Sequence, residues 1–94
     1  MSKVLKSYKQ AYKFVQDNGE WSIIVAMSKD SAKQEYKNFY NVSDNQYKKN
    51  NTKAFLIKNK KTKVKSAFFD NKIPIEVVVN HVKFPPRVVC DFED

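Results

Sequence analysis

The stretch EWSIIVAMSKDSAKQEYKNFYNV, residues 20–42, decides the fold of this chain. Every residue from Ile23 to Met27 is apolar, and an apolar run without a polar face is typical of a strand buried on both sides. Ser28 then has the side chain of a helix N-cap, and Asp30 would place a negative charge in the first turn. The stretch therefore predicts a strand in the interior of a sheet, residues 20–27, followed by a helix that runs to about Val42.

Residues 1–18, which precede this unit, predict a further helix. Lys6, Lys9 and Lys13 recur about one helical turn apart and would share one side. The pair Asn18-Gly19 then supplies the left-handed stop that glycine adopts readily. The opposite side of this helix would be apolar and would carry Val4, Leu5, Tyr8, Ala11, Tyr12 and Val15.

The second half of the chain predicts strands. Residues 53–58 and 62–69 follow a period of two and are separated by Asn59-Lys60-Lys61, which predicts a hairpin with a lysine tip. A third strand is expected over residues 74–84, and Pro85-Pro86 would end it before a last strand over residues 87–92.

The expected fold class is α+β. Two helices would pack on one face of a small antiparallel or mixed sheet of four to five strands, in the order α-β-α-β-β-β-β and within a single domain, residues 1–94. The first strand and the second helix should supply much of the core. The residues expected to be largely buried are Trp21, Ile23, Val25, Tyr36 and Phe39.

Positive charge is concentrated in one part of the sequence. The chain has 18 basic and 10 acidic residues, a net charge of +8, and no acidic residue lies between Asp44 and Asp70. A local excess of this kind attracts polyanions in a salt-dependent way. The candidate polyanion- or partner-binding residues are Lys48, Lys49, Lys53, Lys58, Lys60, Lys61, Lys63 and Lys65. Two simpler interpretations remain open: a solvated lysine face without a partner, and the codon bias of an AT-rich genome, which favours lysine over arginine.

Most catalytic motifs lack a required residue in this sequence. One glycine excludes both glycine-rich phosphate loops, and one cysteine with one histidine cannot form a structural zinc site. His81 and Cys90 could face each other if the last two strands paired about Pro85-Pro86, but packing in a sheet explains such a pair more simply than nucleophilic catalysis. We therefore expect no active site, no cofactor and no metal.

The cysteine content, the first residues and the lengths of the apolar runs also indicate a cellular location. A lone thiol fits a reducing compartment, the lysines among the first residues interrupt any signal-peptide core, and no apolar run reaches the ~20 residues of a membrane span. These features predict a cytoplasmic protein that does not interact with membranes.

Three hypotheses of function follow. The first is a non-catalytic inhibitor that binds a host protein or protein–nucleic acid complex, a nucleic-acid-handling defence enzyme; in size, residue bias and absence of catalytic motifs the chain resembles accessory proteins of phages and mobile elements. The second is a nucleic-acid-binding module of low sequence specificity, with Phe55 or Tyr47 stacking on bases. The third is a small RNA-cleaving toxin that uses His81.

Overall fold

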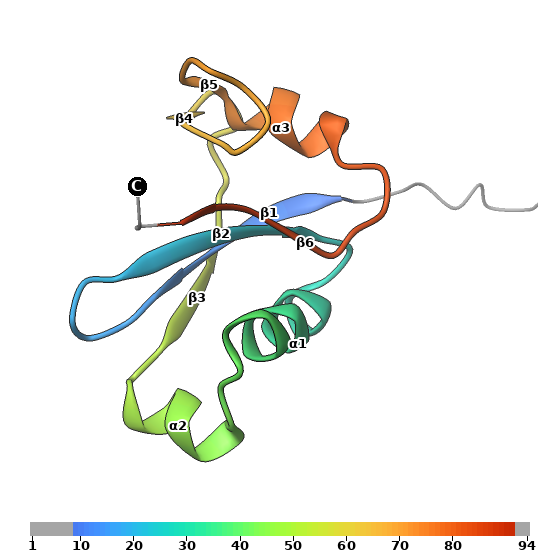
Figure 1. The fold of residues 1–94 in the computed structure, drawn as a ribbon. Coiled ribbons are helices and arrows are strands. Elements are labelled where there is room, and N and C mark those ends of the chain that lie inside the picture. The colour runs from blue at the N-terminus through green and yellow to red at the C-terminus, as the bar shows by residue number, and fades with distance from the viewer. Residues whose placement is uncertain (1–8, 92–94) are drawn as a thin grey trace, which may run out of the picture.

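A computed structural model describes residues 9–91 and has an α+β fold, as expected from the sequence (Figure 1). A four-stranded antiparallel sheet has the strand order β3-β1-β2-β6. Its strands are β1 (Gln10–Val15), β2 (Trp21–Ala26), β3 (Lys53–Leu56) and β6 (Arg87–Asp91). The other elements are α1 (Lys29–Tyr40), α2 (Asp44–Lys49), α3 (Ile75–His81) and a two-stranded sheet of β4 (Lys63–Val64) and β5 (Ile73–Pro74).

Other elements pack on both faces of the sheet. In Figure 1, α1 and α2 lie on what we call the lower face, whereas α3, β4 and β5 lie on the upper face. The lower core joins Phe14 and Ile24 to Tyr36 of α1, and the upper core joins Ile23 and Val25 to residues of α3. Two helices on one face were expected; the structure has them in α1 and α2 and adds a third helix, α3, against the other face.

The strand–helix unit over residues 20–42 is confirmed. β2 lies between β1 and β6, and its residues from Ser22 to Ala26 are buried. The Ser28 hydroxyl accepts a hydrogen bond of 3.0 Å from the Ser31 backbone N–H and so caps α1. The main departure is Phe39, which is 58% exposed although it was expected in the core, because the buried side of α1 runs through Ala32 and Tyr36.

The predicted helix over residues 1–18 is wrong for residues 10–15, which form β1; residues 1–8 lie outside the described part of the chain. Ala11 packs in the upper core, while Tyr12 and Phe14 pack in the lower core. A strand buried on both faces has no clear polar side, so its apolar residues also fit a helical period. Gly19, at φ 91°, belongs to the β1–β2 hairpin turn and does not end a helix.

The predicted strand over residues 74–84 is largely helical instead, since residues 75–81 form α3. Its β-branched residues favour a strand by propensity, but Ile75, Val78 and Val82 are buried at helical spacing. Val77 is 42% exposed, which a strand with a buried Ile75 would not allow. Burial against the upper face of the sheet therefore outweighs propensity here.

The predicted lysine-tipped hairpin is also wrong. β3 pairs with β1, and β4 pairs with β5. Ala54 lies opposite Phe14 in this pairing, and Ile57 donates its backbone N–H to the Ala11 carbonyl at 2.9 Å. Because residues 10–15 form a strand and not a helix, they offer β3 a partner that the hairpin prediction did not include.

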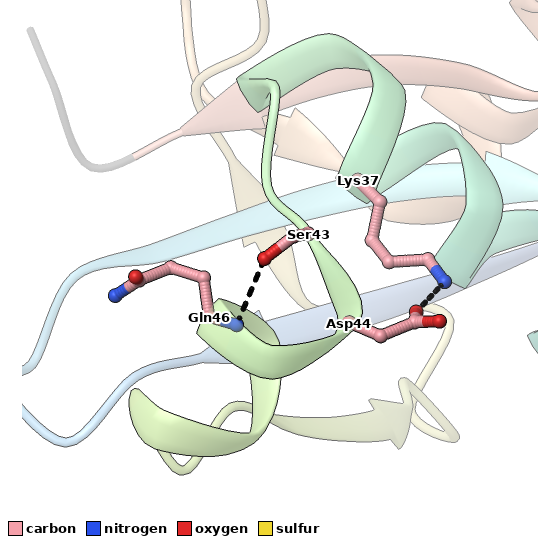
Figure 2. A network of polar contacts seen from close by, with 4 residues as sticks. All are labelled: Lys37, Ser43, Asp44 and Gln46. Carbon is pink, nitrogen blue, oxygen red and sulfur yellow. Dashed lines mark hydrogen bonds and ion pairs between the residues drawn. The ribbon is translucent and has the colours of Figure 1, made fainter.

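Polar contacts hold α2 against α1 (Figure 2). The Ser43 hydroxyl caps α2 by accepting from the Gln46 backbone N–H at 3.1 Å, and the Lys37 ammonium pairs with the Asp44 carboxylate. The hydrogen bond and the charge of Lys37 lower the pKa of Asp44 from its ordinary value of 3.8.

This pair makes a small contribution to stability that depends on pH. Since the pKa of Asp44 is lower in the folded than in the unfolded state, the contribution is present above pH 3.8 and is lost as the pH falls through the folded-state pKa. Asp44→Asn should therefore lower the melting temperature slightly at neutral pH, and the difference from the wild type should close at acid pH. Thermal melts of both proteins across this range test it; a difference that persisted well below pH 3.8 would contradict the assignment.

Candidate polyanion-binding surface

Residues 57–67, which we call the crossing segment, pass over the upper face of the sheet from β1 to β6. Ile57 is bonded to β1, the Cys90 thiol donates to the Lys65 carbonyl at 3.0 Å, and the Ala67 N–H donates to the Val89 carbonyl at 3.1 Å. Two backbone bonds tie the same segment to the start of α3, from Ile75 N–H to the Thr62 carbonyl and from Glu76 N–H to the Lys60 carbonyl. Its path is therefore fixed at both ends and in the middle.

The crossing segment carries five of the eight candidate lysines. All five side chains are exposed. The buried positions of this segment are Val64 and Ser66, which lie between lysines in the sequence. Between residues 9 and 91 the ion pair is Lys37–Asp44, so none of these five lysines forms an ion pair with a carboxylate in that range. The five are Lys58, Lys60, Lys61, Lys63 and Lys65.

Two of the remaining three candidates lie on the other side of the sheet from this group. Lys48 and Lys49 end α2, on the lower side of the sheet, whereas Lys53 begins β3. All three are exposed. The single patch suggested by proximity in the sequence is therefore divided, because β3 begins next to α2 and the chain that follows β3 continues to the upper face (Figure 1).

Two aromatic residues and two lysines form what we call the basic aromatic face. Alternate residues of a strand share a face, and so do directly opposite residues of paired strands. Lys13 lies opposite both Ile23 and Phe55, and Val15 lies opposite both Trp21 and Lys53, which places all of them on the upper side. Phe55 is 51% exposed and Trp21 is partly buried. The basic aromatic face comprises Lys13, Trp21, Lys53 and Phe55.

Lys13 and Trp21 contact each other directly. The Lys13 ammonium lies 5.1 Å from the centroid of the Trp21 ring. A cation–π contact at an exposed site contributes about 0.5–1 kcal/mol, less than the about 1–3 kcal/mol of a base stacked on an aromatic ring.

Sequence reasoning placed Lys13 on a solvated helix side and Trp21 in the core; Trp21 does pack in part against the upper core, but its contact with Lys13 was missed. The signal that could have found them is Asn18-Gly19, which is as typical of a hairpin turn as of a helix end. A hairpin about this turn pairs β1 with β2 and brings Lys13 near Trp21.

Tyr47, the other aromatic candidate, packs against the lower core and so lies on the other side of the sheet from the crossing segment. Its ring packs against Tyr36 edge-on with centroids 5.8 Å apart, and the Lys33 ammonium lies 4.7 Å from its centroid. Burial raises the pKa of its phenol, with a smaller contribution from Tyr36.

A hollow of about 440 Å³ lies where β1 and the crossing segment meet α3. Lys58 and Lys60 line it, together with Lys9 and Glu76. The Lys9 ammonium donates to the Val82 carbonyl at 2.7 Å, and the Glu76 carboxylate carries the opposite charge. The hollow is therefore less basic than its lysines alone would make it.

His81 and Cys90 do not lie on paired strands. The predicted pairing of two strands about Pro85-Pro86 does not occur, because His81 ends α3 and Cys90 pairs with Ile23 in the sheet. The imidazole packs against Phe68 and Phe69, with centroids 4.7 and 5.2 Å apart. Cys90 is buried. The strand register that motivated a Cys–His pair is therefore absent.

Within residues 9–91, no group of three or more His, Cys, Asp or Glu side chains could hold a metal ion. In the same range no helix is long and apolar enough to cross a membrane. Comparisons of the chain with protein-family models, with curated proteins and with solved structures found no match.

Proposed function

We propose that this protein is a non-catalytic binding protein that attaches to a nucleic-acid backbone through the lysines of the crossing segment. The observation that supports this function is the row of five exposed lysines on one tethered segment, without a carboxylate partner among residues 9–91. Lysine presents a point charge, which suits contact with phosphate better than recognition of base edges. Binding is therefore proposed to be of low sequence specificity and strongly dependent on salt.

Two pairs of adjacent lysines allow a matched test. Lys60→Glu with Lys61→Glu, and Lys48→Glu with Lys49→Glu, each change the net charge from +8 to +4. The first pair lies on the crossing segment and the second on the opposite side of the sheet. A difference between the two variants therefore reports where binding occurs, because their overall charge is the same.

The affinity of labelled DNA and RNA oligonucleotides should be measured by fluorescence anisotropy between about 50 and 200 mM salt. We expect Lys60→Glu/Lys61→Glu to weaken binding and to reduce the slope of log affinity against log salt by about 2, since each lost phosphate contact removes about 1. Lys48→Glu/Lys49→Glu should largely keep the wild-type slope. Equal loss in both variants would show that net charge, and not this segment, controls binding.

The inhibitor hypothesis uses the same lysines against an acidic protein surface, for example on a host nucleic-acid-handling enzyme. It becomes the better explanation if the wild type binds neither DNA nor RNA at low salt. Under the proposed function, nucleic acid binds to the isolated protein without another component.

A further inference from the structure

We infer that the basic aromatic face receives unpaired bases, so that the ligand of this protein is a single strand of nucleic acid and not a duplex. This inference rests on the proposed function, because the crossing segment would hold the phosphates of the same strand. The basic aromatic face would explain why a single strand is preferred to a duplex.

The two aromatic rings stand on strands separated by one other strand. Phe55 belongs to β3 and Trp21 to β2, with Lys13 of β1 between them. Neighbouring strands lie about 4.8 Å apart, and Trp21 is two residues along β2 from Ile23, which is level with Phe55, so the two aromatic positions are roughly 12 Å apart. This spacing gives each ring room for a base of its own, and Lys13 can contact the phosphate between them.

The crossing segment borders this face. Phe55, Lys13 and Ile23 lie opposite one another across the sheet, and Ile23 lies opposite Cys90 in turn. The Cys90 thiol donates to the carbonyl of Lys65, so the basic segment reaches the same row of residues as Phe55 and Lys13. A strand whose phosphates follow the crossing segment can therefore turn its bases towards the two aromatic rings.

The aromatic rings explain a preference for unpaired bases. Stacking requires the flat face of a base, which is covered by neighbouring base pairs within a duplex, whereas every base of a flexible single strand can present it. The exposed Phe55 ring is open to such a base, and the Lys13 ammonium above Trp21 makes a contact weaker than base stacking. Lysine charges alone would bind a duplex equally well.

The only tryptophan of the chain, Trp21, reports directly on this face. Titration with an oligothymidylate should quench its fluorescence, whereas a duplex of equal length should quench it much less at equal saturation. Phe55→Leu keeps an apolar side chain and removes the ring. It should weaken single-strand binding about 5- to 150-fold, the range of one lost stacking contact, and change duplex binding little.

Phe39→Leu is the matched control, since Phe39 is 58% exposed on α1 at the other side of the sheet. It should bind single strands as the wild type does. Equal affinity of Phe55→Leu and Phe39→Leu for the single strand, or equal quenching by single strand and duplex, would overturn the inference.

The two proposals fail in different ways. If Lys60→Glu/Lys61→Glu loses affinity while Phe55→Leu does not, the crossing segment binds nucleic acid and the basic aromatic face takes no base. If neither single strand nor duplex binds the wild type at low salt, both proposals are wrong.

Discussion

Phe14→Ala is expected to lower the free energy of unfolding by about 3–5 kcal/mol, the usual cost of removing a buried phenylalanine ring. Phe14 is fully buried near the end of β1, and its ring stacks on Tyr36 of α1 with centroids 4.9 Å apart. Alanine would leave a cavity between the sheet and α1, and neighbouring strands on both sides prevent β1 from moving to fill it. The substitution therefore weakens the whole lower core.

Urea denaturation followed by circular dichroism measures this effect. Phe39→Ala is the control, because it removes the same ring from an exposed position of α1 and should change stability by no more than about 0.5 kcal/mol. A domain of this length is stabilised by roughly 5–14 kcal/mol in total. Phe14→Ala should thus remove a large share of it, and similar losses in the two variants would contradict the described position of β1.

Ile75→Ala is expected to cost about 2–5 kcal/mol. Ile75 begins α3 and is 2% exposed in the upper core. Its loss would loosen α3 from the sheet, together with the crossing segment that is bonded to the Ile75 and Glu76 backbone. The expected result is a lower denaturation midpoint.

The variant Val77→Ala tests whether residues 75–81 form a helix or a strand. In α3 the Val77 side chain is 42% exposed, so its truncation should change stability little. In a strand, Val77 would share the buried side of Ile75, and both variants would be strongly destabilised. If Val77→Ala and Ile75→Ala lowered stability by similar amounts in the same denaturation experiment, residues 75–81 would be a strand, as their propensity predicts.

The sequence by itself determined the elements whose signals are local. Residues 20–42 combine an apolar run with a helix cap at Ser28, and β2 and α1 follow within a few residues of the expected bounds. Pro85-Pro86 likewise separates the last strand, β6, from what precedes it. Capping and chain-breaking residues act through their immediate neighbours, so no knowledge of the rest of the fold is needed.

The composition of the candidate site was also visible in the sequence, but its arrangement was not. The eight lysines are exposed, yet the structure places Lys48 and Lys49 away from the crossing segment. Lys13 and Trp21 approach each other only because β1 is a strand paired with β2. Proximity along the chain says little about proximity on a surface when a strand passes between the two groups.

Only the tertiary structure decided the identity of β1 and α3. Each is a short apolar segment whose residues fit both a helical and an extended period, so local preference leaves the choice open. β1 is selected because strands lie on both sides of it, and α3 because Ile75, Val78 and Val82 together reach the upper core. The free energy that makes these choices comes from burial against residues distant in the chain, which a local pattern does not contain.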